Sequence, residues 1–289
     1  SGHITNEGLE LTGKFYVLQN TPLKWNIDAN ISFNRNRIGG LKADQFAQKL
    51  WSSADEVFIQ RNGCPIGAIY GYVEDGFYDN LAEVMASPSA DIRAKGAGMI
   101  GEIKYRNFDD NPDITSADRV IIGDTNPDFV YGLTSNFEWK GVTLSFFLQG
   151  SQGNDIFNGN LMDMKMGNVG NITREAYNTR WTEANAAQAK WPKAVSGYER
   201  NMLISNRYVE DGSYLKLKSL NIGYVWKPNF KGISNVNVYA SVTNLFTITG
   251  YSWFDPEVNA FGSDASRRGV DVYSYPSSRT FSLGIKVDF

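Results

Sequence analysis

The densest group of oxygen-bearing side chains lies in residues 105–119, and its spacing is that of a calcium loop. Four side chains fall at the first, third, fifth and twelfth positions, which supply ligands in such loops: Asn107, Asp109, Asn111 and Asp118. The sixth position needs a glycine for a sharp turn, but here it is Pro112, which cannot adopt a positive φ. Asn107 also brings no charge to the first position. The sequence therefore favours a loop that keeps its shape without a metal, with a calcium site as the alternative.

Side chains for covalent or acid–base catalysis are scarce. The chain has one histidine, His3, and one cysteine, Cys64. The residues needed for a Cys–His pair or a Ser–His–Asp triad are therefore almost absent. Cys64 cannot form an internal disulfide, and a buried or loop thiol is its expected role. The glycines at 150, 153 and 170 form no phosphate-binding pattern ahead of a helix. The sequence therefore predicts no catalytic and no cofactor-binding residues, and a protein that is not an enzyme.

Aromatic residues are abundant, at 13% of the chain, and several fall in segments without strand periodicity: Trp181, Trp191, Tyr251, Trp253, Phe254 and Phe261. Such rings, beside Asp, Asn and Arg, suit stacking on sugar rings or gripping a peptide. Packing of the loops against one another, or contact with a lid protein, explains each ring equally well. They are therefore candidate contacts, and the sequence does not identify a substrate.

The elements that must position these side chains are strands. Alternation of apolar and polar residues, which gives a strand two unlike faces, predicts seven of them: 8–17, 23–34, 129–139, 142–149, 214–226, 236–243 and 280–289. The second strand slightly exceeds the 9–11 residues that a tilted strand needs to cross a bilayer, and core strands of soluble proteins are usually about half as long. A change of phase after Leu217 predicts a bulge near Lys218 and Ser219.

The connections between the strands alternate between short and long. Short turns lie near residues 20, 140 and 229, and long segments cover 38–128, 150–206 and 248–276. Outer-membrane barrels place short turns on the periplasmic side and long loops outside the cell. Three tryptophans beside the short turns match an interfacial aromatic girdle, although core packing also explains any one of them: Trp25, Trp139 and Trp226. Within the long segments we expect helices at 43–51, 80–86 and 173–181, and a strand or an ordered loop at 67–78.

Composition excludes several other classes. The net charge of −3 contains no block of like charge, so neither nucleic acid nor an anionic membrane surface is an expected partner. No apolar run approaches the length of a membrane helix, which leaves strands that cross a membrane possible. Nothing at the start resembles a signal peptide, and we expect the sequence to be part of a longer protein.

Several motifs follow one another in the last third of the chain. They are RYVEDGSYLKLK at 207–218, NIGY at 221–224, NLFT at 244–247, YSWFDPE at 251–257, Tyr275-Pro276 and Arg279-Thr280. This order and spacing resemble the C-terminal third of the SusC/RagA family of TonB-linked outer-membrane nutrient transporters. The resemblance covers nearly the whole chain and is densest after Asn206. Family members often carry a calcium-type loop where this chain has Asn107 and Pro112.

The resemblance implies an all-β fold, the C-terminal portion of a transmembrane antiparallel β-barrel, with about seven of 22 strands and long extracellular loops. Residues 1–289 would be the C-terminal segment of the barrel domain, 38–128 a large extracellular loop region, and the plug domain would lie outside this sequence. It also implies a Gram-negative outer-membrane location and TonB-dependent import of a large nutrient, a glycan or a peptide. The implied partners are a SusD-like surface lipoprotein, the TonB complex through the missing N-terminal part, the remaining barrel and plug residues, and outer-membrane lipid.

The alternation assigns each strand face an environment. A lumen is expected to face the polar set Asn26, Asp28, Asn30, Ser32, Thr143, Ser145, Asn237, Tyr239, Ser241, Lys286 and Asp288. Lipid is expected to face the apolar set Trp25, Ile27, Ile31, Leu144, Phe146, Val238, Val242, Leu283 and Ile285. Phe289 is expected to act as an assembly signal, as C-terminal aromatic residues do in the family. The alternatives are a siderophore receptor, a passive porin, or a soluble β-sandwich that binds carbohydrate or acts as an adhesin.

Overall fold

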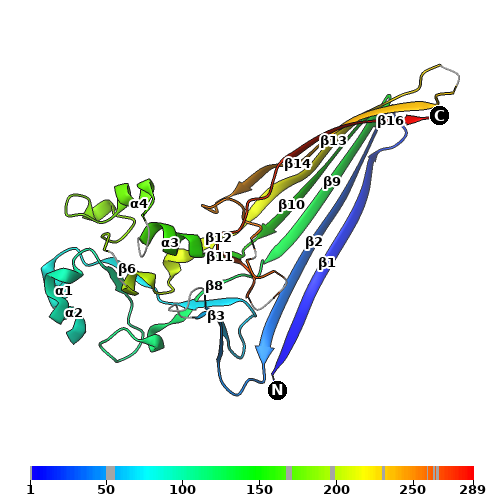
Figure 1. Ribbon diagram of the computed structural model, residues 1–289. Coiled ribbons are helices and arrows are strands. Elements are labelled where there is room, and N and C mark those ends of the chain that lie inside the picture. Colours follow the sequence, from blue (N-terminus) through cyan, green and yellow to red (C-terminus); the bar gives the residue numbers. More distant parts are fainter. Residues whose placement is uncertain are drawn as a thin grey trace.

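One seven-stranded antiparallel sheet dominates the computed structural model, which describes residues 2–49, 56–166, 171–195, 199–229, 232–258, 260–262, 264 and 267–289. Its strands, in spatial order, are β1 (His3–Leu18), β2 (Leu23–Gly39), β9 (Phe129–Trp139), β10 (Val142–Gln152), β13 (Tyr214–Trp226), β14 (Asn235–Thr249) and β16 (Thr280–Asp288). Figure 1 shows them side by side as a long curved wall. Strand order follows chain order, so β1 and β16 form the two edges of an open sheet.

The seven predicted strands are confirmed. Two of them, β9 and β13, have the predicted bounds, while β1, β2, β10 and β14 extend further than predicted. The predicted bulge is also confirmed, because the pairing of β13 with both of its neighbours passes from Leu217 to Ser219 and leaves Lys218 unpaired. On β14 the alternation stops at Asn244, which has a left-handed backbone with φ 52°. The strand continues beyond it to Thr249, which explains why periodicity alone ended it too early.

Register gives the sheet one polar and one apolar face. Directly paired residues form a polar row across it: Asn26, Asn136, Ser145, Asn221, Ser241 and Ser282. Asn136 Nδ2 donates to Asn26 Oδ1 at 2.9 Å, and Ser145 Oγ donates to Asn136 Oδ1 at 2.7 Å. The adjacent row, on the other face, is apolar: Trp25, Phe137, Leu144, Ile222, Ala240 and Leu283. The predicted polar and apolar sets therefore lie on opposite faces of the sheet.

The two ends of the sheet differ. Short turns join β1 to β2, β9 to β10 and β13 to β14 at the end where the C-terminus lies (Figure 1). The described parts of residues 40–128, 153–213 and 250–279 lie beyond the opposite end of the sheet and form a separate lobe. In the part of the chain that is described, no helix is long and apolar enough to span a membrane.

The described residues of the lobe form three small sheets and several short helices. The first sheet has four strands, in the order β3 (Gln45–Lys49), β4 (Glu56–Gln60), β5 (Ala68–Gly71) and β8 (Val120–Asp124). The second pairs β6 (Glu74–Phe77) with β7 (Ile103–Tyr105). The third has the order β12 (Val209–Asp211), β11 (Asp155–Asn158) and β15 (Val270–Asp271). The α-helices are α1 (Leu81–Met85), α2 (Ala90–Lys95), α3 (Gly159–Met166) and α4 (Arg174–Thr179). The 3₁₀ turns are η1 (Gly96–Met99), η2 (Ser116–Asp118), η3 (Ala186–Gln188), η4 (Glu199–Met202) and η5 (Asn206–Tyr208).

Local chemistry explains the helices that were predicted. Asn80 caps α1 by accepting from Glu83 N, and Thr173 caps α4 by accepting from Ala176 N. The helices expected at 80–86 and 173–181 are thereby confirmed, and 67–78 contains β5 and β6. The helix expected at 43–51 is wrong for its described part. Residues 45–49 form β3, because pairing with β4 and packing of Phe46 on Tyr70 at 5.8 Å outweigh a weak helical pattern; residues 50–51 lie outside the described residues.

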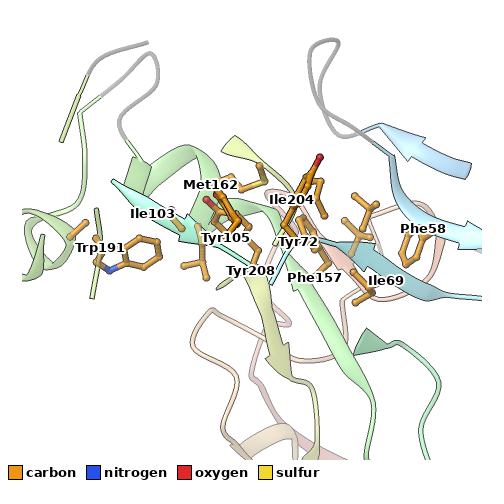
Figure 2. Close-up of a cluster of buried hydrophobic side chains, with 14 residues drawn as sticks. Phe58, Ile69, Tyr72, Ile103, Tyr105, Phe157, Met162, Trp191, Ile204 and Tyr208 are labelled. Atoms are coloured by element: carbon orange, nitrogen blue, oxygen red, sulfur yellow. The ribbon is translucent and has the colours of Figure 1, made fainter. Parts of the chain in front are cut away.

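The apolar core of the chain lies in the lobe. Figure 2 shows Phe58, Ile69, Tyr72, Ile103 and Phe157 gathered with the other members of one buried cluster: Val57, Tyr105, Leu161, Met162, Ala176, Trp191, Ile204, Tyr208 and Val270. These residues come from all three long segments, and none belongs to the seven-stranded sheet. On the apolar face of the sheet, by contrast, Leu283 and Ile285 are 79% and 68% exposed. The lobe packs like a soluble protein, and the sheet leaves its apolar face uncovered.

Candidate functional site

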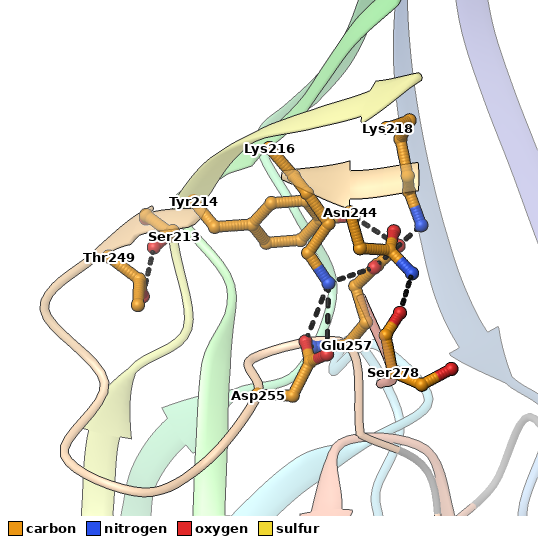
Figure 3. Close-up of polar contacts among 9 residues, drawn as sticks. All are labelled: Ser213, Tyr214, Lys216, Lys218, Asn244, Thr249, Asp255, Glu257 and Ser278. Carbon is orange, nitrogen blue, oxygen red and sulfur yellow. Dashed lines mark hydrogen bonds and ion pairs between the residues drawn. The ribbon is translucent and has the colours of Figure 1, made fainter. Parts of the chain in front are cut away.

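A cluster of four charges fastens the third long segment to the polar face of the sheet. Lys216 Nζ donates to Asp255 Oδ1 at 2.8 Å and also to Glu257 Oε2, and Lys218 Nζ reaches Glu257 Oε2 at 2.6 Å. Lys216 is only 1% exposed. Figure 3 shows both ammonium groups converging on the two carboxylates of residues 255–257. We call Lys216, Lys218, Asp255 and Glu257 the ion cluster.

The strand geometry explains why both lysines reach the same segment. Lys216 pairs with Gln149 on β10 and with Thr247 on β14, which places it on the polar face. Lys218 is the extra residue of the bulge. A bulge re-aims a side chain locally, and here it adds a second ammonium group on the side where Glu257 lies.

The charges of the ion cluster balance. Burial alone would raise the pKa of the Asp255 carboxyl, but hydrogen bonds from Lys216 and Ser277 outweigh it and leave that pKa lowered. The pKa of Glu257 is lowered in the same way, against burial, by Lys216 and Lys218. Glu257 N also donates to Asp255 Oδ1 at 3.0 Å. Both carboxylates are therefore ionised at neutral pH, and the cluster carries no net charge.

A polar pocket of about 310 Å³ lies beside the ion cluster. Its floor is the polar face at the lobe end of β9, β10 and β13, and its roof comes from residues 256–258 and 268–269. The polar side chains that line it are Thr125, Gln149, Ser151, Asn154, Tyr214, Glu257 and Arg268. This pocket is therefore held open by the same contacts that fix the third segment.

The predicted calcium-type loop is built on hydrogen bonds to its own backbone. Asn107, Asp109 and Asn111 each accept, through Oδ1, the N–H of the residue two positions on, at 3.0, 2.8 and 3.1 Å. Asp118 is fully buried and accepts from Phe108 N and Thr115 N, both at 2.7 Å. Among the described residues, no three or more His, Cys, Asp or Glu side chains gather as metal ligands would. The absence of tight calcium binding stays a prediction.

Three of the candidate aromatic rings are buried in the lobe. Trp181 Nε1 donates to Asp79 Oδ1 at 2.8 Å, and Tyr251 donates its hydroxyl proton to Asp271 Oδ2 at 2.6 Å. Trp191 packs in the core, with the Arg207 guanidinium 5.2 Å from its ring centre. In this conformation these rings hold the long segments together.

The remaining candidate rings are more accessible. Trp253 is half-buried and meets Phe254 edge-on at 5.3 Å, and Phe254 is 69% exposed. Phe261 is half-buried beside the Arg267 guanidinium. A role for any of the six rings in contacting cargo or a lid protein stays a prediction.

The ion cluster was not predicted from the sequence. Its members lie in two of the motifs that carry the family resemblance, KLK at 216–218 and DPE at 255–257. The available signal was two lysines at a predicted bulge on a strand, since charges on a strand that packs against other elements need partners. Their partners come from a loop about 40 residues later, and the pairing cannot be read from periodicity.

A second buried carboxylate joins the first two long segments. Glu102 is 1% exposed and lies 3.8 Å from Lys193 Nζ, and its Oε2 has no hydrogen-bond partner among the residues that the structure describes. Burial raises the pKa of Glu102 to about 7, although the charges of Lys193 and Arg200 oppose the rise. Glu102 therefore titrates near neutral pH at a contact between segments, and this too was missed.

Known structures identify the class of fold to which the chain belongs. No protein-family model matches the chain. Its fold is that of the RagAB peptide importer in the open-open state, with a TM-score of 0.73 and 21% identity over all of this chain and 29% of that one. A structure of the RagAB peptide transporter gives a TM-score of 0.72 and also 21% identity. The chain is thus a segment of an antiparallel β-barrel of this class.

Relatives in sequence agree with that class. TonB-dependent receptor P3 of Formosa agariphila is 33% identical over the whole chain, and TonB-dependent receptor SusC of Bacteroides thetaiotaomicron is 26% identical. The chain spans 29% and 27% of these relatives, less than a third of their length. The matches confirm the resemblance to the C-terminal part of SusC/RagA receptors and the Gram-negative outer-membrane location. By name, these relatives are receptors and an importer.

Proposed function

We propose that the protein containing this chain actively imports a large nutrient, a glycan or a peptide, across the outer membrane. In this proposal the TonB complex supplies the energy through a part of the protein outside this sequence. A SusD-like lipoprotein closes over the lobe at the mouth. The observation that carries the proposal is the contrast between a lobe with a buried apolar core and a sheet whose apolar face is bare.

The bare face fits lipid. Monomeric soluble proteins rarely expose contiguous apolar patches above a few hundred Å², whereas this face runs across all seven strands. Aromatic residues lie at both borders of this apolar face: Trp139 and Phe129 are the two ends of the 11-residue strand β9. At a rise of ~3.3 Å per residue and a tilt of ~40°, they are about 25 Å apart along the membrane normal. That is the height of the apolar band in outer-membrane barrels.

The opposite face fits the lumen of a large barrel. Its rows are amides and hydroxyls, and most charges on it are paired, as in Lys24 with Glu138 at 3.1 Å and Lys14 with Asp28 at 3.6 Å. In hydrocarbon a sheet edge costs several kcal/mol per unpaired group, so the strands must belong to a closed barrel. We propose that the seven strands are the C-terminal segment of a plugged, 22-stranded barrel and that residues 38–128 lie outside the cell.

Transport by the whole receptor tests this proposal. Cells that carry the complete protein and its lipoprotein are supplied with labelled oligosaccharides or peptides, with and without the TonB complex and with a proton uncoupler. We expect uptake to stop in both of the latter conditions while the amount of receptor stays constant. Uptake that survives both would indicate a passive porin, and uptake of ferric siderophores alone would indicate a siderophore receptor.

The position of the lobe has its own test. Protease added to intact cells should cut within residues 38–128 of the full receptor, whereas the short turns near residues 20 and 140 should be cut only after the outer membrane is opened. The reverse pattern would invert the proposed orientation. Recovery of the full receptor from buffer without detergent would instead favour a soluble sandwich.

A further inference from the structure

The polar pocket beside the ion cluster lies where cargo would pass. Gln149 and Ser151 belong to the lobe end of β10, and Tyr214 begins β13 opposite Ser151. All three face the polar side of the sheet, so the pocket opens from the proposed lumen at the level of the mouth. Its volume of about 310 Å³ is at the lower end of the range of ligand sites, which suits a single ring with its substituents.

The uncharged groups of the pocket are both donors and acceptors, and several are already fixed. Ser151 Oγ donates to Asn154 Oδ1 at 2.7 Å, and the Tyr214 hydroxyl donates to Glu257 Oε1 at 3.2 Å. Gln149 adds a side-chain amide to the lining. Hydroxyl groups of a sugar donate and accept in the same way, so this mixed lining matches a polyhydroxylated ring.

One charge of the pocket lining is not balanced. The ion cluster is neutral, and Arg267 is paired with Asp264 at 2.6 Å. Arg268, the next residue, lines the pocket, is exposed, and makes no ion pair with a carboxylate of the described residues. A guanidinium binds a carboxylate or a sulfate through two parallel hydrogen bonds. The pocket therefore favours a ligand with an anionic group.

The sheet beneath the pocket disfavours capture of a peptide by strand addition. That mode needs an exposed sheet edge, and β9, β10 and β13 are each paired on both sides. A peptide here would lack the backbone pairing that gives strand addition its affinity.

We propose that this pocket binds one acidic sugar unit, a ring that bears a carboxylate or a sulfate ester. Arg268 pairs with the anionic group, and Gln149 and Asn154 bond the ring hydroxyls. The proposal rests on the proposed function, since it makes the pocket a subsite on the path of an imported glycan.

The test compares two matched probes on the complete receptor with its lipoprotein, purified in detergent. Methyl glucuronide and methyl glucoside differ only in the anionic group, and their dissociation constants can be measured by ligand-observed NMR. We expect the wild type to prefer the glucuronide at least fivefold and Arg268→Gln to abolish that preference. Gln149→Leu should weaken both probes by a similar factor. Arg35→Gln, which removes an exposed arginine on β2 outside the pocket, should change neither.

Three results would overturn the pocket assignment. They are equal binding of both probes, a preference that survives Arg268→Gln, and binding of a short peptide that depends on Arg268 when neither sugar binds. In each case TonB-dependent uptake, measured separately, would leave the proposed import function in place. Loss of TonB dependence would refute the import function whatever the pocket binds.

Discussion

At the scale of single residues, the ion cluster decides where the third long segment lies. Replacing Lys216 by Met should leave Asp255 buried without its cation, and breaking a buried pair in this way costs about 3–5 kcal/mol. We expect hydrogen exchange and protease cutting to rise within residues 250–279 of the full receptor. The control is Lys14→Met, whose pair with Asp28 is 55% and 41% exposed and should contribute about 0–1 kcal/mol. Equal effects of the two substitutions would mean that the cluster does not hold the segment.

Glu102 should make the stability of the lobe depend on pH. Its pKa is about 7 in the folded lobe against an ordinary value of 4.5, so the folded state binds the proton more tightly. Stability should therefore be full below about pH 4.5 and fall as the pH rises to about 7, by up to about 3 kcal/mol. Glu102→Gln has no proton to lose and should flatten this dependence, measured by hydrogen exchange at residues 96–106 between pH 5 and pH 8.

A matched control separates this effect from other titrating groups. Glu10→Gln alters an exposed strand position and should keep the wild-type pH dependence. A pH dependence of the same size in Glu102→Gln would assign the effect to another group.

At the scale of elements, two neighbouring residues on β10 test the faces of the sheet. Phe146 lies on the apolar face and Ser145 on the polar face, both close to the middle of the strand. Phe146→Arg should lower the free energy of unfolding of the receptor in lipid by about 2–4 kcal/mol, because the charge meets hydrocarbon. Ser145→Arg should cost much less, since its side chain meets the lumen. Similar costs of the two substitutions, measured by unfolding in vesicles with a fluorescent probe placed on the sheet and not on the lobe, would contradict the assignment.

One glycine on the last strand makes room for an aromatic ring on β14. A Cβ at Gly284 would lie 2.4 Å from the Tyr239 ring, because the two residues pair directly and the ring covers the glycine. Gly284→Val should therefore destabilise the pairing of β14 with β16 by about 1–3 kcal/mol, as overpacking does. Tyr239→Ala in the same chain should recover most of that loss, as a double-mutant cycle can measure. Full additivity would show that the two side chains do not interact.

Periodicity predicted the large sheet because each long strand repeats its pattern over eight or more residues. The same method failed for β3, where five residues carry no clear period and pairing with β4 decides the structure. It could not find β11, β12 and β15, whose two to four residues come from segments far apart in the chain. The ion cluster and the Glu102 contact were missed for the same reason, since both join residues that only the tertiary fold brings together.

At the scale of the whole molecule, Phe289 tests how the barrel is assembled. The ring is 91% exposed just beyond β16, so its removal should disturb little packing. Deleting Phe289 should lower the amount of receptor in the outer membrane more than it lowers uptake per receptor, and Phe289→Tyr should restore that amount. Quantitative blots of membrane fractions and uptake assays measure the two quantities. Reduced uptake per receptor at a normal amount would assign Phe289 to transport.

Because the apolar core lies apart from the sheet, the lobe and the sheet are stabilised by different solvents. Water stabilises the lobe, through the burial of residues such as Phe58, Phe157 and Tyr208, while lipid stabilises the sheet by covering residues such as Leu283. Urea acts mainly on the first and a change of detergent mainly on the second. Unfolding therefore has no reason to be two-state. A single melting temperature would describe only the part of the protein that the probe follows. The lobe could unfold while the sheet stays folded in the membrane.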